Sequence, residues 1–267
     1  MKNKVVIITG ASSGIGKACA SAFFKRGARL VLVARTESKL IELTKSITNL
    51  GGEAIYVVAD VSKEADCANM INKSIEAYGS IDILINNAGI SMRALFLDLD
   101  LGDFEKVMRI NFYGTVYATK YALKHILATK GSIVGVSSIA GHKGLPARTA
   151  YSASKFAMTG FLEALRIENL KKGLHVLVAS PGFTSSNIRQ NAINASGNHQ
   201  KESPRNEKKM MSSEEVAEKI ASAVDKRKNS IVLTSQGKLL VFLNKFLPNL
   251  VDRLVFNSLS KEKKSPF

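Results

Sequence analysis

The chain has 267 residues and can form a large core, since 45% of its residues are hydrophobic and 22% are charged. This composition excludes disordered, collagen-like and coiled-coil proteins, and the length fits one open α/β domain of about 250 residues. The net charge of +16 permits contact with a polyanion, whereas two cysteines (Cys19 and Cys67) and four unclustered histidines predict neither a disulfide framework nor a metal site.

Short apolar runs alternate with helix-length stretches along the first two thirds of the chain. The runs are dense in valine, isoleucine and leucine, as in parallel strands that are covered on both faces. We expect strands at residues 5–9, 29–34, 54–59, 81–85, 132–137 and 175–179, and a seventh at 231–234.

Helix-length stretches lie between these runs, at 15–26, 37–50, 64–78, 102–128 and 150–172. Glycines at their ends fit the left-handed residue that terminates many helices, namely Gly27, Gly51, Gly52, Gly79, Gly131 and Gly173. The alternation predicts a doubly wound, Rossmann-type α/β fold, a parallel sheet with helices on both faces. No repeat or linker divides the chain, so we expect residues 1–267 to form one domain.

The pattern changes after the sixth strand. Residues 183–211 are polar and non-periodic, and together with a helix to about residue 226 they predict a substrate loop or lid region over 183–226. Ser212 and Glu215 have the spacing of a capping box at the start of that helix. Residues 238–259 are amphipathic, and we expect Pro248 to divide them into two helices. Their shared apolar face is predicted to contain Leu239, Leu243, Phe246, Leu247, Leu250 and Leu254.

A glycine-rich turn joins the first strand to the first helix, with the sequence Thr-Gly-Ala-Ser-Ser-Gly-Ile-Gly over residues 9–16. Its glycines allow the backbone to approach a pyrophosphate at the positive end of a helix. Such a turn also occurs at ordinary strand–helix corners, and the spacing differs from the commoner G-x-G-x-x-G. The residues expected to contact a dinucleotide here are Gly10, Ser12, Ser13, Gly14, Ile15 and Gly16.

Tyr151 and Lys155 are four residues apart, so in a helix they lie on the same face. A free tyrosine has a pKa near about 10, and a cation within about 4–6 Å lowers that pKa. Tyr151 could then exchange a proton with an alcohol or carbonyl oxygen at neutral pH. An isolated pair of this kind also occurs on ordinary helix surfaces, but here a serine pair ends the preceding strand, thirteen residues before the tyrosine.

These motifs together resemble those of the short-chain dehydrogenase/reductase family. The resemblance runs over residues 5–184 and includes, in chain order, the turn at 9–16, Asp60, Asn86-Asn87-Ala88-Gly89, Asn111, Ser137-Ser138, Tyr151-x3-Lys155 and Pro181-Gly182. It implies that Tyr151 is the acid or base, that Ser138 binds the substrate oxygen, and that Lys155 acts on Tyr151 and the nicotinamide ribose. It also implies that Asn111 serves a proton relay.

The resemblance further assigns residues to the nicotinamide cofactor. Asp60 and Val61 are expected beside the adenine, and Asn87, Ala88 and Gly89 beside the ribose, although the last turn also has a structural use. The remaining expected cofactor contacts are Ser137, Tyr151, Lys155, Pro181, Gly182 and Thr184.

The choice of cofactor depends on the end of the second strand, where members that use NAD carry an acid. Here that position is Ala34, followed by Arg35 and Thr36. A guanidinium group is a preferred partner of a phosphate, and Ser12 adds a hydroxyl. We therefore expect NADP(H), with a solvent-facing Arg35 as the alternative.

The C-terminal region is basic as well as apolar. Residues 226–267 carry two acidic side chains, Asp252 and Glu262, and nine basic ones: Lys226, Arg227, Lys228, Lys238, Lys245, Arg253, Lys261, Lys263 and Lys264. This tail resembles that of reductases similar to 11β-hydroxysteroid dehydrogenase. It could pack on a partner subunit or the substrate pocket, contact an anionic membrane, or be disordered. With no export signal and no membrane span in the sequence, we expect a cytoplasmic protein that can touch a membrane peripherally.

The sequence therefore predicts an NADP(H)-dependent oxidoreductase that acts on a lipophilic ketone, an aldehyde or the corresponding alcohol. The family resemblance implies a homodimer or homotetramer formed through the helices at 102–128 and 150–172. One alternative is a non-catalytic protein that senses NADP(H) on the same fold. A nucleic-acid-binding protein is not expected, because no recognised motif is present and only 7% of residues are aromatic.

Overall fold

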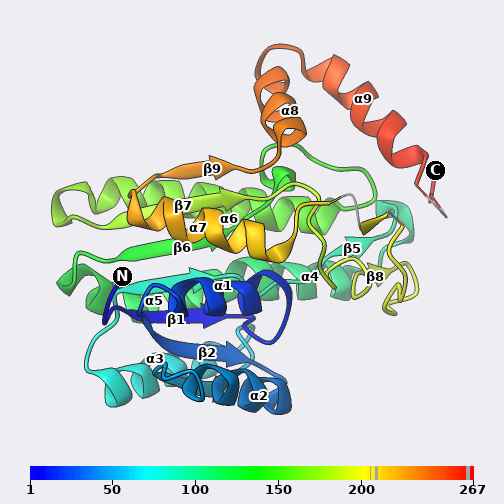
Figure 1. Cartoon of the computed structure of the whole chain (residues 1–267). Coiled ribbons are helices and arrows are strands. Elements are labelled where there is room, and N and C mark those ends of the chain that lie inside the picture. Colours follow the sequence, from blue (N-terminus) through cyan, green and yellow to red (C-terminus); the bar gives the residue numbers. More distant parts are fainter. Residues whose placement is uncertain (205, 208–209, 263–264) are drawn as a thin grey trace.

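A seven-stranded parallel sheet forms the centre of the molecule in the computed structural model, which describes residues 1–204, 206–207, 210–262 and 265–267 (Figure 1). The strand order is β3-β2-β1-β4-β6-β7-β9, which confirms the predicted doubly wound sheet. The strands are β1 (Val5–Thr9), β2 (Arg29–Ala34), β3 (Ala54–Val58), β4 (Ile83–Asn86), β6 (Ser132–Val136), β7 (His175–Ser180) and β9 (Ser230–Val232).

Helices cover both faces of this sheet. One face is covered by α1 (Gly14–Phe24), α2 (Glu37–Thr48) and α7 (Ser213–Asp225), and the other by α3 (Glu64–Tyr78), α5 (Gly114–Ala128) and α6 (Thr149–Glu168). The side chains of β1 alternate between the two cores, with Val6 and Ile8 on the α1 side and Val5 and Ile7 on the α3 side. All four side chains are fully buried, which explains why this strand is apolar throughout.

Most predicted helix ends agree with the structure. Gly27, Gly51, Gly79 and Gly173 have the expected positive φ, whereas Gly52 does not. The prediction for Gly131 was wrong, because the left-handed residue at that turn is Lys130, with φ 48°. Gly131 is required for a different reason: a Cβ there would overlap the carbonyl oxygen of Asp82.

The predicted helix at 102–128 is divided in the structure. It consists of α4 (Leu101–Met108), a π-helical turn (Arg109–Tyr113) and α5, and the widened turn contains Asn111. Asn111 is completely buried there. Short 3-10 helices lie at Phe96–Asp98, Ile139–Gly141 and Leu170–Lys172.

The polar segment 183–211 is attached to the body of the protein. Its strand β8 (Ile193–Asn194) pairs in parallel with β5 (Met92–Arg93), and buried Ile193 packs beside Met92. The segment leads into α7, whose capping box joins Ser212 and Glu215 as predicted. Residues 205, 208 and 209 of this segment lie outside the described residues.

The C-terminal region forms two helices, α8 (Ser235–Phe246) and α9 (Pro248–Ser260), so Pro248 divides the segment as expected. They extend beyond the β9 edge of the sheet (Figure 1). The side of the pair that packs on the protein differs from the predicted apolar face: Val251, Val255 and Leu259 are buried against Ala140 and Leu145. The members of the predicted face that remain exposed are Leu239, Phe246, Leu247, Leu250 and Leu254.

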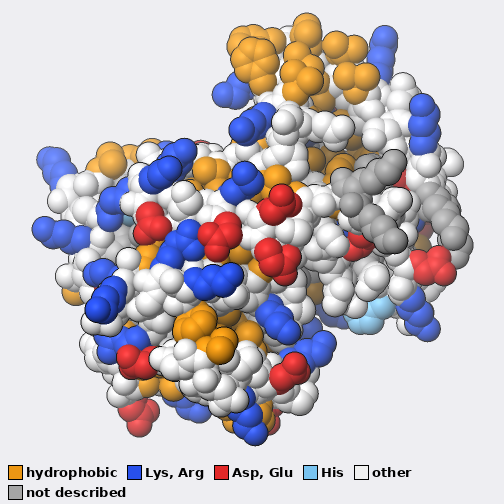
Figure 2. Space-filling view, in the orientation of Figure 1, with side chains coloured by type: hydrophobic (Ala, Val, Ile, Leu, Met, Phe, Trp, Pro, Cys, Tyr) orange, Lys and Arg blue, Asp and Glu red, His pale blue; other side chains and the backbone are white. Residues whose placement is uncertain are grey.

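Hydrophobic side chains gather in the region of α8 and α9 at the top of the molecule, with lysine and arginine side chains nearby (Figure 2). Of the basic tail residues, Lys263 and Lys264 lie outside the described part of the chain. No helix among the described residues is both long enough and apolar enough to cross a membrane.

Candidate active site and cofactor cleft

The strand order reverses between β1 and β4, and a cleft opens beyond the carboxyl ends of these two strands. Thr9, at the end of β1, joins the two sides. Its hydroxyl donates to the carbonyl of Ile85 at 3.2 Å and accepts from the backbone N–H groups of Asn87 at 3.0 Å and Ala88 at 3.1 Å. The turn at 87–89 therefore has a structural function as well as a position in the cleft.

Two glycines bring the backbone turns into close contact. A Cβ at Gly10, where φ is 68°, would lie 2.8 Å from the side-chain nitrogen of Asn87. A Cβ at Gly16 would overlap the carbonyl oxygen of Gly10. The N-terminus of α1 can thus stand directly beneath a bound pyrophosphate, as the turn sequence requires.

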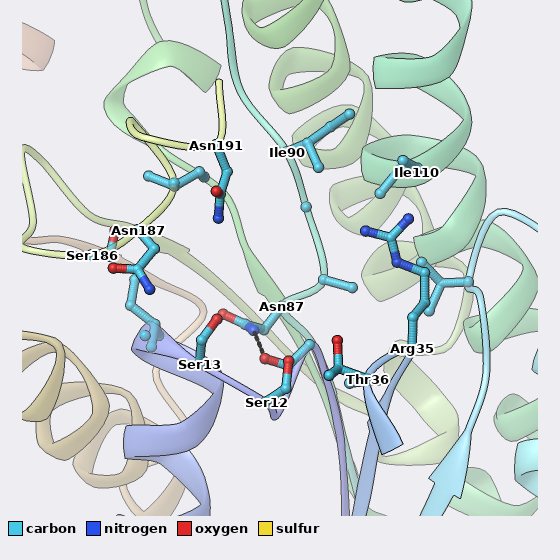
Figure 3. A pocket seen from close by; sticks show the side chains of 18 of the residues that line it. Ser12, Ser13, Arg35, Thr36, Asn87, Ile90, Ile110, Ser186, Asn187 and Asn191 are labelled. Carbon is cyan, nitrogen blue, oxygen red and sulfur yellow. Dashed lines mark hydrogen bonds between the residues drawn. The ribbon is translucent and has the colours of Figure 1, made fainter. Parts of the chain in front are cut away.

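The cofactor cleft has a volume of about 380 Å³ and brings together most of the predicted contacts. Ser12 and Ser13 lie along its floor, with Arg35 and Thr36 at one end (Figure 3). Lys39, in the first turn of α2, also lines this end and was missed by the sequence analysis. The predicted residues lining the cleft are Gly10, Ser12, Ser13, Gly14, Ile15, Arg35, Thr36, Asp60, Val61, Asn87, Ala88 and Gly89.

Asp60 lies near this end of the cleft, beside Arg35. Its burial opposes ionisation, but two hydrogen bonds from Ser62 and the charges of Arg35 and Lys63 lower the pKa of its carboxyl group. The cluster of cations beside it provides an environment suited to a phosphate.

The opposite wall of the cleft comes from the segment 183–211, which sequence analysis placed only in general terms. Asn187 and Asn191 lie across from Ser12 and Arg35 in Figure 3. Ser186, Ile188 and His199 also line this wall. No motif marks these residues, because the backbone fold of the segment and its pairing with β5 decide which side chains face the cleft.

A second pocket, here called the catalytic pocket, adjoins the cofactor cleft, and Ile15, Asn87 and Gly89 line both. It has a volume of about 110 Å³. The predicted residues that it brings together are Ser137, Ser138, Tyr151, Lys155, Pro181, Gly182 and Thr184. Ser138 thus faces Tyr151 as expected, whereas the hydroxyl of Ser137 lies 3.2 Å from that of Thr159.

Asn111 lies behind this pocket and holds the neighbouring chain in place. Its side-chain oxygen accepts from the backbone N–H of Ile90 at 2.8 Å, and its side-chain nitrogen donates to the carbonyl of Ile90 at 2.9 Å. The same nitrogen donates to the hydroxyl of Ser154 at 3.0 Å. A Cβ at Gly89 would lie 3.1 Å from Asn111 Oδ1 and 3.7 Å from Lys155 Nζ, so Gly89 leaves these two groups close together.

Lys155 is buried, and its Nζ donates to the carbonyl of Val136 at 2.8 Å. Burial lowers the pKa of Lys155 to about 8. The Nζ atom lies 5.7 Å from the centre of the Tyr151 ring, on the same face of α6, as the four-residue spacing requires.

The electrostatic environment of Tyr151 differs from the expected one, in which Lys155 lowers the pKa of Tyr151. Burial raises the pKa of Tyr151, while a hydrogen bond with Ser138 and the charges of Arg148 and Arg189 oppose that rise. Both arginines line the catalytic pocket and were missed by the sequence analysis. Arg148 could have been identified as a candidate from the sequence, because it lies three residues before Tyr151. Nothing in the sequence points to Arg189.

Arg189 fixes the segment after β7 to the pocket. Its Nη2 donates to the carbonyl of Thr184 at 2.6 Å and lies 2.9 Å from Glu207 Oε1. Thr184, an expected cofactor contact, is held in turn by a β-bridge to Met211. The arrangement can hold a carbonyl or alcohol oxygen between two hydroxyl groups, next to a cleft that can hold a dinucleotide.

Comparison with known proteins finds dehydrogenases that are similar to this chain. The profile described as short chain dehydrogenase matches residues 4–196. The chain is 35% identical over 271 residues to dehydrogenase/reductase SDR family member 7B of Mus musculus, covering 99% of this chain and 84% of that protein. It is 42% identical over 190 residues to an 11-beta-hydroxysteroid dehydrogenase of Pinus massoniana, covering 70% of this chain and 53% of that protein.

A solved structure has the same fold. A short chain dehydrogenase/reductase from Burkholderia phymatum, in complex with NAD, aligns with a TM-score of 0.83 at 24% sequence identity. The alignment covers 93% of this chain and 95% of that structure.

Proposed function

Because the chain belongs to the short-chain dehydrogenase/reductase family of oxidoreductases, we propose that it transfers hydride between NADP(H) and a lipophilic ketone, aldehyde or secondary alcohol. The observation that carries this proposal is the catalytic pocket, in which the hydroxyls of Ser138 and Tyr151 meet beside a cleft whose glycines admit a pyrophosphate. When bound, the cofactor supplies or accepts the hydride at its nicotinamide ring.

The residues of the pocket divide the remaining work. Ser138 donates a hydrogen bond to the substrate oxygen and orients it. Tyr151 gives its hydroxyl proton to that oxygen during reduction and takes a proton back during oxidation. Lys155 places a cation on the same helix face, and Asn111 fixes the chain at Ile90 and the hydroxyl of Ser154. The complete set favours an enzyme over a non-catalytic sensor, which needs no proton donor.

The phosphate end of the cofactor cleft supports NADP(H) as the cofactor. Arg35, Thr36 and Lys39 line this end, and β2 ends in Ala34 rather than in an acid. A guanidinium group can bind two phosphate oxygens at once, and Lys39 adds a point charge. Adenine is proposed to lie between Asp60 and Val61.

An apolar groove supports a lipophilic substrate. It has a volume of about 390 Å³, lies between α8 and α9, and is lined by Leu240, Leu243, Val251 and Val255, among others. Ile139, Leu145 and Phe183 line both this groove and the catalytic pocket. An apolar body could therefore extend from the reacting carbon towards the C-terminal helices.

Turnover tests the proposed function against the sensor alternative. We expect NADPH to be consumed with at least one member of a panel of lipophilic ketones and aldehydes, with an equal amount of alcohol formed. Binding of NADPH without consumption across the panel would support a sensor and contradict the proposed activity.

The helices α5 and α6 are the proposed contacts of a homo-oligomer. Tyr113, immediately before α5, and Phe156 and Ile167 on α6 are exposed, although all three are large apolar side chains. Exposed apolar area on adjacent helices is typical of surfaces that pair with another subunit.

The exposed apolar side chains of α8 are proposed to contact an anionic membrane surface. Leu239, Phe242 and Phe246 are 58%, 60% and 68% exposed. Lys238 and Lys245 are on the same helix, so apolar insertion and attraction to anionic lipid can act together. The tail is then peripheral to a membrane while α9 packs against the catalytic domain.

We predict that the full-length protein sediments with phosphatidylserine-containing vesicles at low salt and is released at high salt. Replacing Phe242 and Phe246 with Ser should reduce the bound fraction several-fold, since burial of each phenyl group contributes about 1.5–3 kcal/mol. Leu50→Ser, at a residue that is 73% exposed beyond α2, is the matched control. A different result would assign the exposed apolar side chains of α8 to subunit contact instead. In that result the wild-type protein stays in the supernatant and the double variant no longer forms the oligomer that the wild-type protein forms.

A further inference from the structure

The segment that joins Ser138 to Tyr151, residues 139–148, is covered by the C-terminal helices and is here called the catalytic loop. Asn244 of α8 donates to the carbonyl of His142 at 3.2 Å, and Asp252 of α9 lies 2.6 Å from Lys143 Nζ. Beneath these contacts the loop packs on α9 through the apolar residues Ala140, Leu145, Val251, Val255 and Leu259. The C-terminal helices therefore hold the part of the chain whose two ends carry the reacting hydroxyls.

A buried ion cluster follows directly after α9. Glu262 Oε2 lies 3.4 Å from Arg93 Nη2 and 3.4 Å from Arg148 Nη2. The side chains of Glu262, Arg93 and Arg148 are 3%, 7% and 9% exposed. Burying these charges is costly unless they remain paired, so each member of the cluster constrains the position of the others.

Arg148 connects this cluster to the catalytic pocket. It is the residue before the first turn of α6, three positions before Tyr151, and it lines the pocket. Among the described residues, the charged groups around Tyr151 are Arg148 at the start of α6, Lys155 within α6, and Arg189 of the 183–211 segment. Glu262 and Arg93 adjoin Arg148, and Glu207 pairs with Arg189.

We propose that Glu262 is a positioning residue of the active site, which holds Arg148 and thereby fixes the start of α6 and the Tyr151 hydroxyl opposite Ser138. This inference rests on the proposed function, because it assigns Glu262 a task within the same reaction. It makes the C-terminal segment a working part of the reductase, although Glu262 touches neither substrate nor cofactor. The contact spans 114 positions of the chain, and only the fold brings its two ends together.

Three variants test the positioning role: Glu262→Gln, Arg148→Gln and the double variant. Lys261→Gln, at the exposed neighbouring position, is the control for a lost charge. We expect Glu262→Gln to lower kcat by about 10- to 100-fold, as misplacement of reacting groups does, with the NADPH dissociation constant nearly unchanged. The double variant should be no slower than Arg148→Gln, because Glu262 acts through Arg148.

The pH profile gives a second, signed test. During reduction Tyr151 must be protonated, so its pKa sets a basic limb of the kcat profile above the region near pH 8 in which Lys155 titrates. Arg148 lowers the pKa of Tyr151, so Arg148→Gln should move that limb to higher pH. Glu262→Gln removes a negative charge from beside Arg148 and should move the limb to lower pH. Tyrosinate absorbance, taken as the difference from Tyr151→Phe, provides the same comparison without turnover.

The outcomes separate this inference from the proposed function. A wild-type protein that reduces no carbonyl would contradict the proposed function. If the wild-type protein is active and Glu262→Gln has the same kcat, only the positioning role is contradicted. Parallel loss of thermal stability, NADPH binding and activity in Glu262→Gln would also overturn the positioning role, because it would indicate a purely structural contact. If Glu262→Gln does not fold, Glu262→Asp is the second test. It keeps the charge but has a side chain one methylene shorter, which should move the carboxylate away from Arg148 and lower kcat. Retention of wild-type kcat in Glu262→Asp would contradict the role.

Discussion

Replacing Tyr151 with Phe is expected to reduce kcat by at least about 100-fold, the usual effect of removing a general acid or base. The ring and its packing remain, so the pocket should keep its shape while losing the hydroxyl that meets Ser138. The NADPH dissociation constant should change little, because we expect binding to depend mainly on the glycine-rich turn and on the phosphate end of the cofactor cleft. Stopped-flow measurement of a single turnover would separate the chemical step from product release.

The matched control for this variant is Tyr113→Phe, which removes a phenol hydroxyl from an exposed tyrosine before α5. It should have wild-type kinetics. A Tyr151→Phe variant with near-normal kcat would remove Tyr151 from the mechanism, even if it bound NADPH normally.

A reversal of cofactor preference is the second large effect expected. Ala34→Asp combined with Arg35→Ala places an acid at the end of β2 and removes the guanidinium group from the phosphate end of the cleft. A charge-assisted hydrogen bond contributes about 1.5–3 kcal/mol, so the ratio of kcat/KM for NADPH to that for NADH should fall by about 10- to 100-fold. Side-by-side initial rates with the two cofactors measure this ratio.

Lys45→Ala is the control for the loss of a basic side chain from the α2 region, because Lys45 is exposed and does not line the cofactor cleft. It should leave the preference unchanged. A wild-type enzyme that already prefers NADH would contradict the assignment of Arg35 to a phosphate. Lys39→Ala should also lower the ratio of kcat/KM for NADPH to that for NADH, but by less than the double variant does, because it leaves Arg35 in place.

The fold could be predicted because the local and global patterns agree. The apolar runs at β1 and β2 had the lengths and the dense β-branched content of doubly covered strands, and the structure contains both within the predicted bounds. The fourth strand begins later than predicted, at Ile83, directly after Asp82. Its carboxylate accepts from the backbone N–H of Val5 and pairs with Lys4. Polar side chains that bind a neighbouring strand end do not reveal themselves by periodicity.

Some residues of the candidate site could be predicted from the sequence and others could not. Tyr151 and Lys155 could be predicted because their spacing places them on one helix face and because a serine pair ends the preceding strand. Arg148, Arg189 and Glu262 matter through contacts across the fold, with partners that no local pattern identifies. The tail shows the limit most clearly: the period of its apolar residues predicted a helix pair, but two apolar faces were available, and packing against Leu145 selected that of Val251 and Val255.

The most direct test of the central claim is to follow a labelled hydride. NADPH that carries deuterium at C4 of the nicotinamide, on the transferred face, should deliver deuterium to the carbonyl carbon of a lipophilic ketone. Mass spectrometry should find one deuterium in the alcohol for each NADPH consumed by the wild-type protein, and almost no labelled alcohol with Tyr151→Phe in the same time. Unlabelled alcohol, or tight NADPH binding with no alcohol from any ketone or aldehyde tested, would contradict the assignment of this chain as an NADP(H)-dependent carbonyl reductase.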